Sequence, residues 1–378
     1  MLFSIYPATQ NSTGDAIAGV IVLLLMAIVW RVRKSPHKLS PYGMIIALFL
    51  CLVHYLFPQT GGDFNSYKDW VETSGFTNVD IISMYYMHFE KVYYVIVNFV
   101  HNDYFLFRLV VWGTSLILFC FTAKRLEIDF NIFVFFLCIG IVPMTSTSRV
   151  CLAYAIAFFG FSFITKPITR RGSNLLSFII GSLLVLLSLY FHRSAIFLLL
   201  PLPLSLFNIN KNTLKLLPIL FAVIVVFLNS NLYSYLNGQS ENSFIDSETA
   251  FAYLQANEKT FGVGHLLRLA LRYAECFALF ILIIKCILDK TYISWPKYIK
   301  SYANATLLIT ILAATFLFVS GNTYKSFERL VGFNTIPQCI LLAYLLKNDI
   351  KKKLVNIIIL LLAGYVAYNI IYDQIYLG

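Results

Sequence analysis

The sequence predicts an all-α, polytopic integral membrane protein with two long external loops, in a single transmembrane domain over residues 1–378. Hydrophobic residues make up 59% of the chain and charged residues only 12%, and the mean hydropathy is +0.76 over 378 residues. A single soluble core cannot bury that much apolar surface. Apolar segments also recur at lengths that cross the roughly 30 Å hydrocarbon core of a bilayer, and they number about twelve.

Each expected span is an apolar run bounded on both sides by polar, charged or proline-containing sequence, which sets its ends to within about 2 to 4 residues. In chain order the spans fall at residues 14–30, 42–57, 104–122, 132–143, 150–164, 175–190, 194–207, 216–228, 265–288, 302–319, 330–346 and 354–372.

Positive charge gathers in every second loop, and the positive-inside rule therefore places these loops in the cytoplasm and both termini outside. With this explanation for the net charge of +11, nucleic-acid binding is not expected. The cytoplasmic positions are Arg31, Arg33, Lys34, Lys38, Lys124, Arg125, Lys166, Arg170, Arg171, Lys211, Lys215, Lys285, Lys290, Lys297, Lys300, Lys347, Lys351, Lys352 and Lys353.

The two long external loops, residues 58–103 and 230–263, are acidic, and long loops on one side of a protein commonly cover a binding site. Within the second loop, residues 246–261 are expected to form an interfacial helix. Six arginines nevertheless fall on this outer face, where a cluster of forked cations is suited to hold a phosphate or diphosphate. They are Arg108, Arg149, Arg193, Arg268, Arg272 and Arg329.

Several other classes of chemistry lack their sequence signals. The seven cysteines lie in or beside apolar spans without a CxxC pair or a Cys/His metal spacing, so neither disulfides nor a metal site is expected. No P-loop pattern is present, which argues against an ATP-driven transporter. The first fourteen residues lack a basic region, so we expect no signal peptide and insertion of the whole chain.

The clearest cationic motif opens the span at residues 265–288. His265, Arg268 and Arg272 recur at spacings of three and four, which places them on one face of a helix. Gly262 and Gly264 precede them, so the free N–H groups of the helix start lie near the same cations. An anion site is one interpretation; the other is an interfacial helix whose arginines extend to lipid headgroups.

Two short external corners carry further cations. His192 and Arg193 lie between two spans, where a neutral imidazole beside a fixed cation can accept a proton. The alternative is that His192 is a polar turn residue. Arg149 follows the hydroxyl-rich stretch after Pro143 and falls in the first turn of a helix. The helix dipole disfavours a cation there, so a bound anion would account for it.

Three more residue groups complete the candidate site. Arg329 begins the penultimate span after another short corner, although pairing with Glu328 or Glu275 is an alternative for any of these arginines. In the first external loop, Asp63 stands four residues before Tyr67 and Glu90 four residues before Tyr94. Carboxylates with tyrosines are suited to binding sugar hydroxyls, but Asp63 after two glycines also fits a turn.

In their order along the chain, these residues resemble the EpsG-like and Wzy-type polysaccharide polymerases of bacterial envelopes. The resemblance rests on short motifs: Gly62-Asp63 with Tyr67, Glu90 with Tyr93, Thr147 with Arg149 and Ala153, Phe191 to Ala195, and Glu328-Arg329. It spans roughly residues 63–329. Lys91 stands where the family often has proline, and Thr147 where serine is common.

The resemblance implies an inner-membrane polymerase that joins undecaprenyl-diphosphate-linked oligosaccharides at the periplasmic face, with a chain-length regulator protein as a partner and no cofactor. Arg149, Arg268, Arg272 and Arg329, with His265, are then expected to bind the departing diphosphate, assisted by Arg193. His192 is the expected general base, and Asp63, Tyr67 and Glu90 the expected sugar contacts. A lipid-linked oligosaccharide flippase or other transporter, a glycosyltransferase that uses monophosphate-linked sugars, and an O-antigen ligase remain alternatives.

Overall fold

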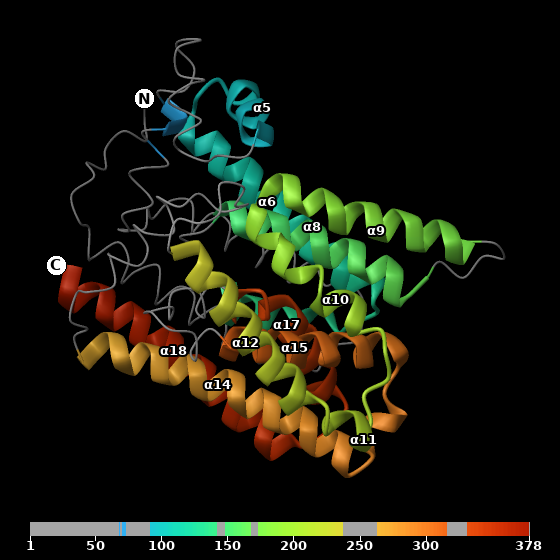
Figure 1. Cartoon of the computed structure of the whole chain (residues 1–378). Coiled ribbons are helices and arrows are strands. Elements are labelled where there is room, and N and C mark those ends of the chain that lie inside the picture. The colour runs from blue at the N-terminus through green and yellow to red at the C-terminus, as the bar shows by residue number, and fades with distance from the viewer. Residues whose placement is uncertain are drawn as a thin grey trace.

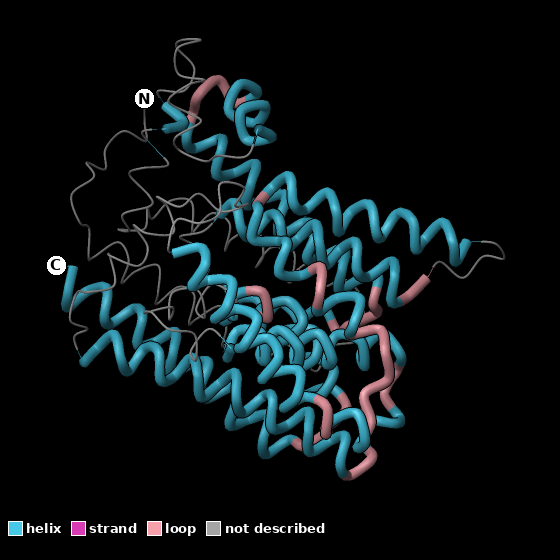
Figure 2. Tube along the Cα trace, in the orientation of Figure 1, coloured by secondary structure: helices cyan, strands magenta, loops and turns pink. Residues whose placement is uncertain are grey.

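The fold is described from a computed structural model, for residues 68, 70–72, 91–141, 148–167, 173–236, 263–315 and 331–377. Within these ranges the chain forms helices joined by turns and loops, with no strand (Figure 2). The predicted all-α class is confirmed for this part of the chain. The expected spans at residues 14–30 and 42–57 and the expected interfacial helix at residues 246–261 lie outside the described residues.

Eight helices coincide with predicted spans, and the ends of each helix lie within several residues of the predicted ends. The largest differences are at α12 and α18, which run past the expected apolar runs, and at α15, which starts before its expected run. The helices are α6 (Tyr104–Arg125), α7 (Phe130–Ile141), α8 (Ser148–Thr165), α9 (Ser173–Phe191), α12 (Leu217–Leu236), α14 (Val263–Leu288), α15 (Lys297–Thr315) and α18 (Lys352–Leu377).

Two predicted spans are not continuous helices. Residues 194–207 form the 3-10 helix η2 (Arg193–Leu198) and the short helix α10 (Pro201–Leu204), since Pro201 and Pro203 have no N–H for a helical hydrogen bond. The span expected at residues 330–346 breaks after residue 332, and α17 (Thr335–Lys347) begins beyond the break.

Three short helices were not expected from the sequence. α5 (Lys91–Phe99) lies inside the first external loop, α11 (Lys211–Leu214) lies in a basic loop, and the 3-10 helix η3 (Thr291–Ser294) follows α14. Each is too short to cross a membrane and connects longer elements.

The helices pack as neighbouring groups with α8 in contact with several of them. In Figure 1, α6, α8 and α9 run alongside one another, α14 lies beside α18, and α15 and α17 lie between these groups. α8 is buried almost all round, as expected for a helix that is apolar on every face. The hydroxyl group of Tyr302 on α15 donates a hydrogen bond of 3.1 Å to the carbonyl oxygen of Phe158 on α8.

α8 and α9 approach each other most closely at a pair of glycines. A Cβ atom built on Gly160 would lie 2.7 Å from the carbonyl oxygen of Gly181, and one built on Gly181 would lie 2.6 Å from the carbonyl oxygen of Gly160. Both obstacles are backbone atoms, which cannot rotate away. Small residues at this crossing therefore allow the two helices to touch, as is common between membrane helices.

The basic loops meet at one end of the helices, which is called the basic end below. A guanidinium nitrogen of Arg125, the last residue of α6, donates to the carbonyl oxygen of Lys166, just after α8, at 2.5 Å. The ammonium group of Lys166 lies 2.9 Å from the Glu127 carboxylate and 5.2 Å from the ring centroid of Tyr298 at the start of α15. Loops that are distant in sequence, but are predicted to be on the same side of the membrane, thus lie together.

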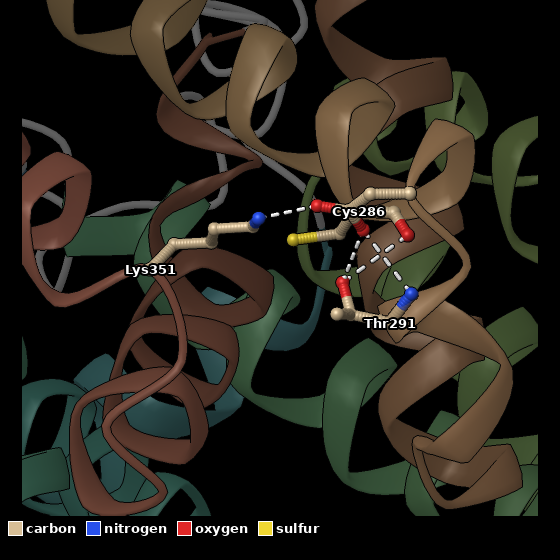
Figure 3. A network of polar contacts seen from close by, with 4 residues as sticks. Cys286, Thr291 and Lys351 are labelled. Atoms are coloured by element: carbon tan, nitrogen blue, oxygen red, sulfur yellow. Dashed lines mark hydrogen bonds and ion pairs between the residues drawn. The ribbon is translucent and has the colours of Figure 1, made fainter.

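A second contact at the basic end joins the loop after α14 to the start of α18 (Figure 3). The Lys351 ammonium group forms an ion pair with the Asp289 carboxylate, and the Thr291 hydroxyl donates to the same carboxylate at 2.6 Å. The hydrogen bond with Lys351 contributes most, and that with Thr291 next, to lowering the pKa of Asp289 to about 2.

Two described helices, Tyr104–Arg125 and Asn174–Phe191, are long and apolar enough to cross a membrane. α9 also exposes large apolar side chains along its length, including Leu176, Leu183 and Tyr190, which suits contact with lipid tails. The expected total of about twelve spans stays a prediction.

Substitution Gly160→Ala is expected to lower the thermal unfolding temperature of the detergent-solubilised protein by several degrees. The added methyl group has to push α8 and α9 apart, and such overpacking costs roughly 1–3 kcal/mol. Gly113→Ala on α6 is the matched control, because a Cβ atom there meets nothing within 4 Å. Equal unfolding temperatures for the two variants would contradict the glycine contact.

Substitution Lys351→Met is expected to lower the unfolding temperature at pH 7 by about 2 °C or less, because an ion pair that water still reaches stabilises a protein only weakly. Because the folded-state pKa of Asp289 is lowered, its stabilisation is full above the unfolded pKa of roughly 3.9 and is lost as the pH falls toward 2. The difference from the unmodified protein should therefore vanish in that range.

The control for this pH series is Lys352→Met. Lys352 pairs with Asp349 three residues earlier, and both side chains are more than half exposed. If Lys351→Met lowers the unfolding temperature as much at pH 2 as at pH 7, the Asp289 carboxylate is not the cause of the change.

Candidate functional site

A second hydrophobic cluster lies at the end of the helices opposite the basic end. We call it the outer cluster, and its buried members are Trp70, Val71, Tyr93, Val97, Val100, Phe107, Val111, Leu152 and Ile156. They come from residues 70–71, α5, α6 and α8, and Phe191 at the end of α9 packs against them. Five separate segments of the chain, from Trp70 to Phe191, therefore meet here.

Aromatic contacts fix the arrangement of the outer cluster. The ring of Trp70 lies 6.1 Å from that of Phe107 on α6, between ring centroids, and meets it edge to face. The ring of Tyr93 lies 6.0 Å from Phe107 and 6.2 Å from Phe191, again in edge-to-face geometry. Such pairs stabilise beyond the area they bury. Phe107 and Tyr93 are the shared centre of these contacts.

The outer cluster brings the flanks of the predicted motifs together. Trp70 follows Tyr67 by three residues, Tyr93 is the tyrosine of the Glu90 motif, and Leu152 is three residues after Arg149. Phe191 directly precedes His192. Motifs separated by more than a hundred residues in the sequence are thus held by one packed group of side chains.

The corner that carries His192 and Arg193 is tightly folded. The backbone N–H of His192 donates to the carbonyl oxygen of Ser188 at 3.1 Å, and the carbonyl oxygen of His192 accepts from the N–H of Ala195 at 2.9 Å. The His192 side chain is half-buried. Arg193 begins η2, which packs against both α8 and α9 and buries Ala195 and Leu198.

Arg149 is the second residue of α8, at its outer end. From Arg149 to Thr165 at the other end of α8 is about 24 Å at the helical rise of roughly 1.5 Å per residue. Five residues after Arg149, the ring of Tyr154 meets that of Phe333 at 4.2 Å. This contact places the segment that follows Arg329 beside the first two turns of α8.

Among the six arginines expected on the outer face, Arg108 is the one whose side chain the structure describes. It lies one turn into α6 and is 7% exposed, with its guanidinium carbon 5.9 Å from the ring centroid of Tyr104. A guanidinium group over an aromatic face gains a cation–π attraction. The sequence placed Arg108 on the outer face but in no motif, so its role was not assigned.

α14 carries His265, Arg268 and Arg272 in its first half. Its buried side chains recur at spacings of three and four, and the same spacing continued toward the helix start reaches Arg272 and Arg268. By backbone register these two residues continue the same line of positions along α14. By helical rise, Arg272 is about 24 Å along α14 from its last residue, Leu288.

Glu275 was expected only as an alternative partner for an arginine, yet it is the most buried acidic residue described, at 0% exposed. It is three residues after Arg272 on the inward face of α14. Buried carboxylates in proteins are almost always paired with cations or hydrogen-bonded. Its position three residues after an arginine in an apolar span was the signal available in the sequence.

The remaining predicted residues lie outside the described part of the chain: Asp63, Tyr67, Glu90 and Arg329. The structure therefore brings together the flanks of five motifs. It does not bring α14 to them, because the main described contacts of α14 are with α18, α15, η3 and α11. In the described ranges no three His, Cys, Asp or Glu side chains form a group able to hold a metal ion.

The chemistry of this outer region follows from its residue types. A half-buried imidazole lies beside an arginine on a rigid corner, a second arginine starts a buried helix, and a third, Arg108, is itself buried. Cations in a water-poor setting stabilise phosphate oxygens more than they would in water. The arrangement suits binding of a phosphorylated ligand.

Comparison with known proteins gives one match. The model of the EpsG family matches residues 40–377. No curated protein and no solved structure matches the chain. Together with the apolar helices of the fold, the match indicates a membrane protein with a polysaccharide polymerase-like role of glycosyltransferase type. The match covers nearly the whole sequence, and the chain belongs to the EpsG family.

Proposed function

We propose that this protein polymerises polysaccharide by joining oligosaccharide repeat units carried on undecaprenyl diphosphate into O-antigen or exopolysaccharide. The reaction takes place at the periplasmic face of the bacterial inner membrane and needs no metal ion. The observation that carries the proposal is the outer cluster, which gathers the flanks of four motifs at the end of the helices away from the basic loops. Family membership supports the same conclusion.

The proposed reaction is a glycosyl transfer. A hydroxyl oxygen of one lipid-linked unit attacks the anomeric carbon of another, and the bond from that carbon to the diphosphate oxygen breaks. The hydroxyl proton passes to a base, and undecaprenyl diphosphate leaves. Because diphosphate is already a good leaving group, stabilising its negative charge is the main catalytic requirement, and arginines supply positive charge for this.

The residue roles follow from placement. Arg149 and Arg329 hold the departing diphosphate, with Arg193 assisting from the corner and Arg108 from α6. Arg268, Arg272 and His265 on α14 are also proposed to bind the departing diphosphate, although the main described contacts of α14 are with other helices than those of the outer cluster. His192 is the general base for the attacking hydroxyl group, and Asp63, Tyr67 and Glu90 contact sugar.

The proposed topology has about twelve spans with both long loops, 58–103 and 230–263, on the periplasmic side. The meeting of the basic loops at one end of the described helices supports this sidedness. A chain-length regulator is the proposed protein partner.

Deletion of the gene distinguishes the proposed reaction from its alternatives. A strain without the polymerase should display a single repeat unit on its surface glycolipid or release only single units. Electrophoresis of the purified glycan measures this. A strain that displays no repeat unit would identify a flippase, and one that accumulates long polymer on the carrier lipid would identify a ligase. Either result would overturn the proposal.

Substitutions Arg149→Ala and His192→Ala should each abolish chain elongation while the protein is still inserted. Loss of one group that stabilises the departing charge lowers such rates by roughly 100-fold. Elongation is measured in membranes with the lipid-linked repeat unit as substrate, normalised to the amount of inserted protein. Lys124→Ala, on an exposed residue at the basic end, is the control. Normal elongation in both test variants would refute the assigned site.

Substitution Arg272→Lys is a finer test of diphosphate binding. It keeps the positive charge but removes the planar fork that contacts two oxygens at once. Elongation should fall roughly 10-fold or more, mainly through weaker binding of the carrier. Arg125→Lys makes the same chemical change at the basic end and should leave elongation unchanged. If Arg272→Lys behaves like this control, α14 does not bind the diphosphate.

A further inference from the structure

The predicted span at residues 330–346 is interrupted inside the helix bundle. Residues 331–332 are helical, residues 333–334 form a turn, and α17 starts at Thr335. The backbone N–H of Asn334 donates to the carbonyl oxygen of Val331 at 2.9 Å, which tightens the chain at this point. Pro337 has no N–H to donate to the carbonyl oxygen of Phe333, so a regular helix cannot continue through the turn.

Three buried polar side chains surround this break. Asn334 and Thr335 are each 1% exposed and Gln338 is 4% exposed. At about 100° per residue, these positions fall within one arc of roughly 100° around α17. The amide nitrogen of Asn334 donates to the hydroxyl oxygen of Thr310 on α15 at 2.8 Å, which anchors the break against that helix.

One atom on each of these side chains has no hydrogen-bond partner among the described residues. They are the amide oxygen of Asn334, the hydroxyl oxygen of Thr335 and the amide nitrogen of Gln338. Buried polar atoms without partners are rare in proteins because leaving them unpaired is costly. Three on one arc of one helix, at a break in that helix, therefore indicate a place for a polar ligand. Interrupted membrane helices commonly mark such places.

The types of atom define the ligand. The amide oxygen accepts hydrogen bonds, the amide nitrogen donates them, and the hydroxyl group does both. A phosphate oxygen would only accept, and a cation would find no carboxylate among the three side chains. A hydroxyl group both donates and accepts, and so satisfies a mixed set. Sugar hydroxyls and water share this chemistry.

The position of the break favours a sugar over water as the ligand. Phe333 immediately precedes Asn334, and its ring contacts Tyr154, five residues along α8 from Arg149. By helical rise, Asn334 is about 20 Å from the basic end of α17, against about 24 Å for Arg149 on α8. A group bound at the break would therefore be close to a diphosphate held at the start of α8.

We propose that Asn334, Thr335 and Gln338 form a binding site for hydroxyl groups of the sugar attached to the carrier diphosphate. This inference rests on the proposed function, since that function supplies the lipid-linked sugar. It adds a neutral subsite, within the helices, to the arginine site at their outer end.

The test compares binding of two probes to the purified, detergent-solubilised protein. One is undecaprenyl diphosphate carrying the repeat unit, and the other is undecaprenyl diphosphate without sugar. Substitution Thr335→Val keeps the side-chain shape but removes the hydroxyl group, and Gln338→Met removes the amide. Each should weaken binding of the sugar-bearing probe about 10-fold, as expected for one lost hydrogen bond, and leave binding of the sugar-free probe unchanged.

Two controls separate a binding role from a folding role. Thr335→Ser keeps the hydroxyl group and should bind both probes normally. Thr165→Val removes a buried hydroxyl at the basic end, one that donates to the carbonyl oxygen of Phe161, and should also leave both affinities unchanged.

Unchanged binding of the sugar-bearing probe by Thr335→Val and Gln338→Met, with an equal or higher unfolding temperature, would overturn the inference and assign the three side chains to buried water. Equal weakening for both probes would also overturn it, because the effect would then lie on the diphosphate. The unmodified protein can bind the sugar-bearing probe, with the two variants weakening that binding as expected, and still not elongate the sugar. In that case the proposed function fails and the subsite stands. If the unmodified protein binds neither probe, both fail.

Discussion

The rest of the structure depends on the close burial of α8. This helix is apolar on every face, and the paired glycines Gly160 and Gly181 allow α9 to approach it until backbone touches backbone. Tyr302 ties α15 to α8 through a hydrogen bond, and Tyr154 ties the start of the α17 segment to it through ring contact. Once α8 is surrounded in this way, its first turn is held at a fixed place, and with it the backbone of Arg149.

The two ends of the bundle are organised by different forces. At the basic end, charged groups meet in exposed loops, where ion pairs such as that of Lys166 with Glu127 are screened by water. At the outer end, aromatic packing around Phe107 and Tyr93 brings the motif segments together. Apolar contacts therefore build the outer region.

Several features of the site were accessible from the sequence because they depend on local order. Positive charge in alternate loops, the spacing of His265, Arg268 and Arg272, and the arginine at the start of an apolar run all reflect helix periodicity or the positive-inside rule. The features that were missed depend on tertiary contacts. Arg108 was expected on the outer face, but its burial against Tyr104 was not. Asn334, Thr335 and Gln338 interrupt the apolar run in the sequence, but only the fold shows that they are buried.

The sequence alone determined that the chain is helical and apolar, where most of its helices start and end, and which loops share a side. These properties follow from hydropathy and charge along short stretches of chain. Only the tertiary structure decided that α8 is the shared partner of its neighbours, that Tyr93, Phe107 and Phe191 meet, and that the segment after Arg329 breaks beside Tyr154. Such contacts join residues far apart in sequence, and the shape of the packed side chains selects them, which no local pattern encodes.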